Sequence, residues 1–199
     1  METISNALFW ISNGLLVPVI VLLLLFLIRA PILVCAFFGQ FFRRREQQRA
    51  LTALLEDDTR LRPALEQFCA SGKAPQSHLV RTLKQLLARG DDASWRERLL
   101  ADYEVEAERE LGQSRILAKL GPMLGLMGTL IPMGPALVGL AAGDLASMAY
   151  NMQVAFATTV VGMLIAAIGV VTLQVKQRWV AREQNDLEFI AEKLNDEKE

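Results

Sequence analysis

Histidine and cysteine are scarce in this chain. Of its 199 residues, one is a histidine, His78, and two are cysteines, Cys35 and Cys69. A single histidine outside the apolar segments cannot supply a histidine-based catalytic triad or a histidine metal site. The two cysteines lie in different kinds of segment, one apolar and one charged, which favours neither a disulfide nor a metal pair. We therefore expect no cofactor, no metal and no catalytic residues.

Lys and Arg are absent from long parts of the chain. Of 21 such residues, one is Arg29, 15 lie between Arg43 and Lys119, and five follow Leu173. Three apolar segments remain, from residue 8 or 15 to about 38, from about 118 to 140, and from about 148 to 173. Each can cross the roughly 30 Å hydrocarbon core of a bilayer, which takes about 20 helical residues. The sequence thus predicts an all-α integral membrane protein with three transmembrane helices and long cytoplasmic helical extensions.

Basic residues flank these segments on one side only. They are Arg43, Arg44, Arg45 and Arg49 after the first, Arg109, Arg115 and Lys119 before the second, and Lys176, Arg178 and Arg182 after the third. The positive-inside rule therefore predicts a protein of the inner membrane whose N-terminus lies outside and whose C-terminal tail lies in the cytoplasm. We expect a first span within 1–42, a cytoplasmic insertion at 43–117, spans at 118–140 and 148–173, an outer turn at 141–147 and a cytoplasmic helix at 174–199. A cleaved signal peptide is disfavoured because no basic region precedes the long first segment.

The first span has two interpretations. Arg29 and Pro31 follow its most apolar part. Either the span ends near Ile28 and residues 32–42 lie along the inner interface, or the helix continues and Arg29 snorkels or faces protein.

Residues 43–117 are predicted to form helices with short breaks. We expect one from Arg43 to about Glu56, a second that opens at Pro63 and runs to Ser71-Gly72, and a third over 76–89 that Gly90 ends. From Ala93 the helical pattern continues into the second span. The charge run over 104–110 is interpreted as a solvated face.

Small or helix-bending residues follow one face of each of the last two spans. They are Gly121, Gly125, Gly128, Pro132, Pro135 and Gly139 in the second span, and Ala155, Thr159, Gly162, Ala166 and Gly169 in the third. Steps of three and four residues keep positions on one side of a helix. Since close association of helices in lipid relies on small residues, these faces predict a multi-helix assembly.

The polar groups in these spans are hydroxyls and freed backbone carbonyls. The two spans contain no Asp, Glu, Lys, Arg or His, but Thr129 lies in one and Thr158 and Thr159 in the other. Pro132 and Pro135 have no N–H, which leaves the carbonyls four residues earlier without their helical partners. Two interpretations stay open: a narrow polar lumen at an oligomer axis, or tight packing with a kink and no lumen.

The sequence resembles the MotA/TolQ/ExbB proton channel family. The resemblance rests on Gly121-Pro122-Met123-Leu124-Gly125-Leu126-Met127-Gly128-Thr129 and on Ala157-Thr158-Thr159-Val160-Val161-Gly162-Met163, and the order of the spans agrees. It implies a homopentamer around a partner of the ExbD/TolR/MotB kind, which has a single transmembrane helix and supplies an aspartate that carries the proton. It also implies that Thr129 and Thr159, with Thr158 beside them, line the ion pathway, and that ion flow drives mechanical work at the cell envelope.

Two departures separate the chain from the ExbB and TolQ branch. Members of that branch carry a glutamate about five residues before the pore threonine of the third span, where this chain has Val154, and prolines such as Pro132 and Pro135 are not typical of it. The work performed, and proton versus sodium, therefore stay open. The alternative function is a non-conducting membrane scaffold that recruits partners through its cytoplasmic helices. Nucleic-acid binding is disfavoured by a net charge of −1.

Overall fold

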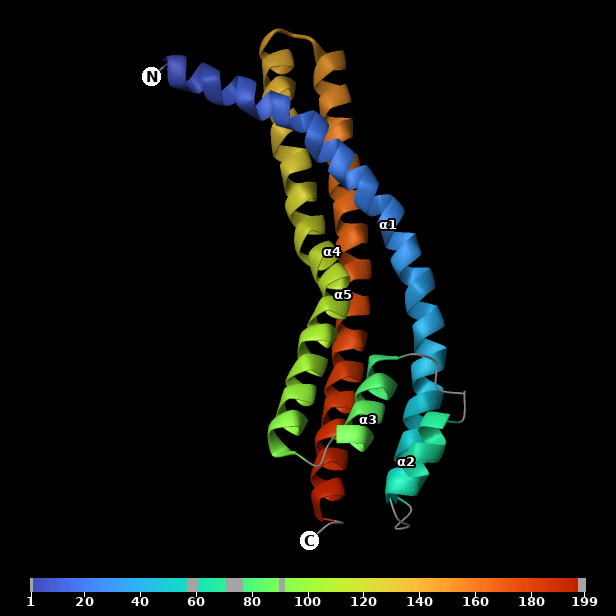
Figure 1. Cartoon of the computed structure of the whole chain (residues 1–199). Helices are drawn as coiled ribbons and strands as arrows, with labels where there is room; N and C mark the ends of the chain where they lie inside the picture. Colours follow the sequence, from blue (N-terminus) through green and yellow to red (C-terminus); the bar gives the residue numbers. More distant parts are fainter. Residues whose placement is uncertain (1, 57–60, 71–76, 90–91, 197–199) are drawn as a thin grey trace. The chain divides into compact units, whose positions relative to one another are not determined.

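The computed structural model describes residues 2–56, 61–70, 77–89 and 92–196, and all regular secondary structure in this part of the chain is helical. Figure 1 shows the helices α1 (Glu2–Glu56), α2 (Leu61–Ala70), α3 (His78–Arg89), α4 (Ala93–Ala141) and α5 (Leu145–Asp196). They form two compact units: unit 1 comprises residues 1–36 and 113–173, and unit 2 comprises 37–112 and 174–199. The three long helices each contribute to both units.

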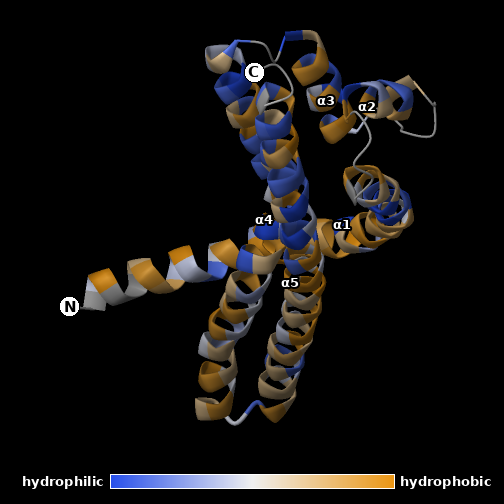
Figure 2. Ribbon diagram, turned by 90° about the horizontal axis from the view of Figure 1, so that it is seen from below, coloured by the Kyte–Doolittle hydropathy of each residue, from blue (hydrophilic) through white to orange (hydrophobic). Residues whose placement is uncertain are grey.

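Three helices are long and apolar enough to cross a membrane. Among the described residues these are Ala7–Leu55, Ala93–Ala141 and Leu145–Asn195, judged by length and composition. Figure 2 shows the hydropathy changing along α4 and α5, from hydrophobic near the turn that joins them to hydrophilic at their other ends. The prediction of an all-helical chain with three candidate spans is confirmed.

In unit 1, the first part of α1 packs on α4 and α5 through one apolar stripe. Val19, Leu23, Ala30 and Leu33 of α1 are buried in a cluster with residues of the other two helices, namely Leu117, Leu124, Ile131 and Ile165. Many other large apolar side chains of this unit stay exposed on the single chain. Exposed apolar surface of this extent requires lipid or further protein around it.

The helix α1 does not end near Ile28. It continues through Pro18, Arg29 and Pro31 to Glu56, and the Arg29 side chain is exposed. Helix α1 is thus continuous through Arg29, and the place along α1 where the first span ends stays a prediction.

A tight turn joins α4 to α5. Gly143 has φ of +75°, a left-handed conformation that suits glycine after the end of a helix. The backbone N–H of Ser147 donates to Asp144 Oδ1 at 3.0 Å, so Asp144 caps the start of α5. The two helices consequently run antiparallel and side by side (Figure 1).

Unit 2 has its own apolar core. Leu61 and Leu65 of α2, Leu83 and Leu86 of α3, and Leu187 of α5 are at most 1% exposed and belong to one buried cluster. The helices α2 and α3 correspond to the helices predicted to open at Pro63 and to precede Gly90. Ser71, Gly72 and Gln76, where we expected the second helix to end and the third to begin, lie outside the described residues. The helix α4 begins at Ala93, where Asp92 Oδ1 accepts the backbone N–H of Ser94 at 2.9 Å.

Candidate functional site

The glycines of α4 and α5 in unit 1 bring the two backbones into close contact. A methyl group added to Gly162 would lie 2.7 Å from the carbonyl oxygen of Gly121 and 2.7 Å from Cα of Gly125. One added to Gly121 would lie 2.9 Å from the backbone nitrogen of Ala166. The backbone of Ala118 likewise occupies the space beside Gly169. No side chain larger than hydrogen fits at these glycines without moving a helix.

Other residues of the two small-residue faces lie along the same contact. Gly139 faces the start of α5 near Ser147 and Met148, and Ala155 is buried. The two faces that the residue spacing predicts thus lie against each other within one chain.

Thr158 fills the space left by the missing side chain of Gly128. A methyl group at Gly128 would lie 2.6 Å from both Cβ and Oγ1 of Thr158. Thr129 and Thr159 each follow one of these two contact residues. A step of one residue turns about 100° around a helix, and in antiparallel helices the two turns lead to the same side of the pair. Thr129 and Thr159, both half-buried, therefore lie at the same level on one edge of the α4–α5 pair.

All three hydroxyls donate hydrogen bonds to carbonyls of their own helix. Thr129 Oγ1 donates to Leu126 O at 2.7 Å, and Thr159 Oγ1 to Ala155 O at 3.1 Å. Thr158 Oγ1 lies within bonding distance of the carbonyls of residues 154 and 155, at 3.1 and 2.9 Å. A hydroxyl that donates to its own backbone keeps its oxygen lone pairs as acceptors. The edge with Thr129 and Thr159 can thus accept a hydrogen bond from an approaching protonated acid.

The helix α4 runs through Pro132 and Pro135 without interruption. Pro132 is fully buried and Pro135 is half-buried. Because neither residue has an N–H, the carbonyls of Gly128 and Ile131 lose their helical donors. The freed carbonyl of Gly128 lies next to Thr129 in the chain, which adds an acceptor near the hydroxyl edge.

The helix pair brings no charge of its own to this edge. Residues 120–143 and 145–175 contain no Asp, Glu, Lys, Arg or His. Among the described residues there is also no group of three or more His, Cys, Asp or Glu side chains that could hold a metal ion. An acidic group at this level would have to come from outside the pair.

A polar cluster in unit 2 escaped the sequence analysis. Arg44 of α1 contacts Glu110 Oε2 of α4 at 2.5 Å and Glu183 Oε1 of α5 at 3.1 Å. Tyr103 donates its hydroxyl to Glu183 Oε2 at 2.6 Å. Arg44, Glu110 and Glu183 have side chains that are 12%, 19% and 8% exposed. The interpretation of residues 104–110 as a solvated face is therefore wrong for Glu110, which forms a largely buried ion pair.

Burial shifts the titration of this cluster. It raises the pKa of Glu183 above its ordinary value, an effect that the Arg44 charge and the Tyr103 hydrogen bond oppose. Burial and the Glu183 charge both raise the pKa of Tyr103. Burial lowers the pKa of Lys176, which lies near Glu110 and Arg44. No sequence motif marks these residues, because the partners of Arg44 are 66 and 139 positions away in the chain.

Comparisons with known proteins agree with the arrangement of α4 and α5. No curated protein matches the chain. A family model described as MotA/TolQ/ExbB proton channel family matches residues 72–188, which include α3, α4 and most of α5. This match covers more than half of the chain. The chain is a membrane protein with three apolar helices, and it belongs to the MotA/TolQ/ExbB proton channel family.

Proposed function

We propose that the chain is the ion-conducting subunit of an inner-membrane complex that couples ion-motive force to mechanical work. The proposal places the N-terminus outside, residues 43–117 and 174–199 in the cytoplasm, and five copies around a partner of the ExbD/TolR/MotB kind. Protons are the proposed ion. The observation that carries the proposal is the uncharged part of the α4–α5 pair, residues 120–143 and 145–175, with Thr129 and Thr159 on one edge.

The physical chemistry of that edge suits a mobile acid. An aspartate of a partner helix can accept a hydrogen bond from a hydroxyl when ionised and donate one to it when protonated. Thr129 and Thr159 provide such hydroxyls, with Thr158 behind them at the helix contact. One elementary charge that crosses 100 mV releases about 2.3 kcal/mol, which is the energy available for work.

The test is proton flux through the complex in liposomes. The chain and its partner are reconstituted together, a potential is imposed, and a pH-sensitive dye inside reports proton entry. In Thr159→Val a methyl group replaces the hydroxyl, so the side chain keeps its shape but loses the hydrogen-bonding oxygen. Because a hydrogen bond to a charged group contributes about 1.5–3 kcal/mol, we expect flux to fall about 10- to 100-fold.

Thr172→Val is the matched control. Thr172 lies in the same helix and donates to Ile168 O at 2.7 Å, as Thr159 donates to its own helix, but it is only 3% exposed. It should keep full flux, and both variants should elute at the size of the unmodified complex. Unchanged flux in Thr159→Val would remove this residue from the pathway. Loss of function in variants of α2 and α3, with tolerance at Thr129 and Thr159, would instead support the scaffold function.

A further inference from the structure

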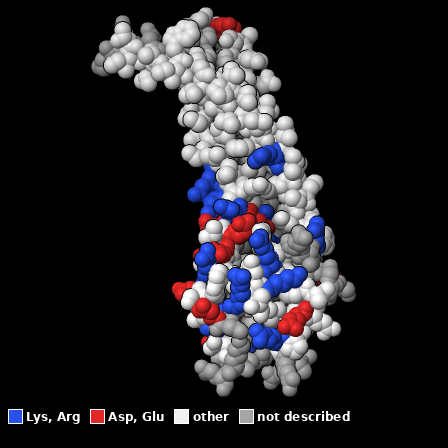
Figure 3. All heavy atoms as spheres, in the orientation of Figure 1, with Lys and Arg blue, Asp and Glu red and all other residues white. Residues whose placement is uncertain are grey.

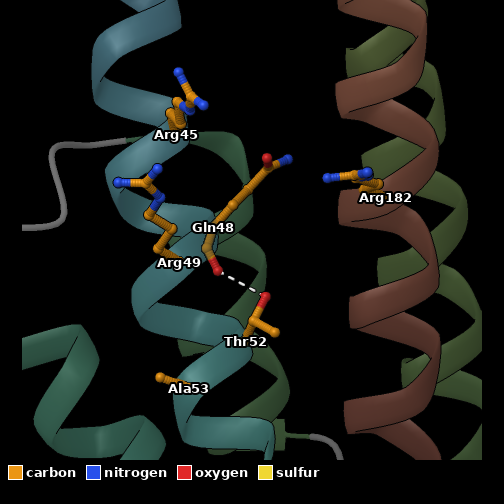
Figure 4. A pocket seen from close by; sticks show the side chains of 6 residues that line it. All are labelled: Arg45, Gln48, Arg49, Thr52, Ala53 and Arg182. Carbon is orange, nitrogen blue, oxygen red and sulfur yellow. Dashed lines mark hydrogen bonds between the residues drawn. The ribbon is translucent and has the colours of Figure 1, made fainter.

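Two adjoining cavities in unit 2 lie between α1 and α5. One has a volume of about 690 Å³ and the other about 370 Å³, and both are bordered by Arg45, Gln48 and Arg182. Together they are referred to here as the basic groove. Its remaining lining residues are Phe41, Arg49, Thr52 and Ala53 of α1 and Val175, Arg178, Trp179 and Ala181 of α5. Figure 4 shows the part near Arg45, Arg49 and Arg182.

The groove concentrates positive charge. Of the described residues, four arginines and no Asp or Glu line it. Arg45 and Arg49 are four residues apart on α1, as are Arg178 and Arg182 on α5, so each pair shares one helix face. Like charges at this spacing repel. An anion between the two helices would relieve the repulsion on both.

The four arginines have no close counter-ion among the described residues. Within the described part of the chain, none of the four forms an ion pair within 4 Å. Glu46 is exposed and does not line the groove. Asp186 lies one turn beyond Arg182; burial raises the pKa of Asp186, and the Arg182 charge opposes this shift. In Figure 3, blue and red atoms gather over unit 2. Arg44, in contrast, forms ion pairs with Glu110 and Glu183.

Gln48 adds an uncharged donor. Its side chain extends from α1 toward Arg182 (Figure 4). The amide nitrogen Nε2 is buried and has no hydrogen-bond partner in the structure. A buried donor without an acceptor is unfavourable, so a ligand oxygen at this place would be stabilised by Gln48 as well as by the arginines.

Aromatic side chains form one side of the groove. Trp179 stacks on Phe37 with ring centroids 5.3 Å apart, and it also contacts Phe41 at 5.8 Å. Tryptophan at the border between apolar and charged segments is typical of the membrane interface. Arg178 comes five residues after Leu173, where the third apolar segment ends, which is about 7 Å along a helix. Arg178 therefore lies at headgroup depth, since headgroups add about 5–8 Å to each side of the hydrocarbon core, and Arg182, one turn later on α5, lies at the water side of the headgroups.

We propose that the basic groove binds the phosphate of an anionic phospholipid headgroup. Arginine forks and the Gln48 amide donate to the phosphate oxygens, and Trp179 and Phe41 contact the apolar surface of the glycerol and headgroup. Soluble phosphate has the same oxyanion chemistry, but it has no apolar part that could contact the aromatic side chains of the groove, and it does not account for the position of the groove next to an apolar segment. The site is separate from the proposed ion pathway and does not depend on it.

The test measures which lipid stays bound to the purified chain. The full-length protein is placed in vesicles of equimolar phosphatidylglycerol and phosphatidylcholine, extracted with mild detergent, and its bound lipids are counted by mass spectrometry. We expect phosphatidylglycerol to be enriched. In Arg45→Gln/Arg182→Gln the enrichment should fall at least about tenfold, because each basic side chain near the surface strengthens binding several-fold.

Two further variants control for charge and folding. Arg98→Gln/Arg109→Gln removes the same charge from side chains that are 69% and 76% exposed, and it should keep the enrichment. Arg45→Lys/Arg182→Lys keeps the positive charge and should retain part of the phosphatidylglycerol enrichment. Equal lipid binding in Arg45→Gln/Arg182→Gln and the unmodified chain would overturn the proposal. The proposal would also be overturned if inorganic phosphate, but not chloride at equal ionic strength, displaced phosphatidylglycerol. It would likewise be overturned if Arg45→Gln/Arg182→Gln changed the oligomer size and kept its lipid, because the groove would then be an interface between subunits.

Discussion

Replacement of Gly162 by alanine should destabilise the chain even though alanine is the better helix former. In an open helix position, Gly→Ala stabilises by up to about 1 kcal/mol. At Gly162 the added methyl group would lie 2.7 Å from two backbone atoms of α4, about 0.7 Å closer than ordinary contact. Because those atoms belong to the backbone of Gly121 and Gly125, no side chain can rotate away. The helices must separate instead.

The size of the effect follows from overpacking. Extra methyl groups in a well-packed interior cost about 1–3 kcal/mol, which outweighs the gain in helix propensity. Separation of α4 and α5 also loosens the contact between Gly128 and Thr158. We therefore expect Gly162→Ala to lower the free energy of unfolding by about 1–2 kcal/mol, measured by denaturant unfolding of the purified protein in detergent.

Gly112→Ala provides the matched control. Gly112 lies in α4, and nothing lies within 4 Å of a methyl group added there. This variant carries the helix-propensity gain alone and should be as stable as the unmodified chain or more so. The packing argument would be refuted if both variants had the same free energy of unfolding.

The remaining predictions concern the polar cluster of unit 2. Arg44→Ala leaves Glu183 buried without its ion-pair partner and should lower the free energy of unfolding by about 3 kcal/mol, whereas Arg43→Ala, at an exposed position, should change it by less than about 0.5 kcal/mol. Denaturant titrations of both variants measure this difference, and equal losses would contradict it. Because the pKa of Glu183 is raised in the folded state, that state binds its proton more tightly, so stability should fall as pH rises above the ordinary value of 4.5. Unfolding measured across this pH range should show a weaker fall in Glu183→Gln, and an identical slope would exclude Glu183 as the cause.

The sequence was sufficient for features that depend on local spacing. Apolar length predicted three spanning helices, and the four-and-three spacing of Gly121, Gly125 and Gly128 defined one narrow face on α4. The sequence could not say that this face would meet Gly162 and Ala166 of the same chain, because any two small-residue faces can pack together.

Features that depend on distant partners could not be predicted. Arg44 stands between Arg43 and Arg45, and charge patterning treats the three alike. Only the packing of α1, α4 and α5 in unit 2 directs Arg44 toward Glu110 and Glu183 and leaves Arg45 in the basic groove. The separation of 139 positions between Arg44 and Glu183 has no counterpart in local helix periodicity.

The close contact of α4 and α5 also limits where ions can cross in the proposed function. At the level of Gly128, the side chain of Thr158 already occupies the space between the helices, so a carboxylate or a file of water cannot pass there. The remaining hydroxyls, those of Thr129 and Thr159, lie on an edge of the pair, and one edge cannot enclose a path in lipid. Because a charge exposed to hydrocarbon is costly, other surfaces must complete the path. In the proposed function, further copies of the chain and the partner provide those surfaces. The α4–α5 pair contains no acid at this depth, so an acid that moves along these hydroxyls has to come from outside the pair.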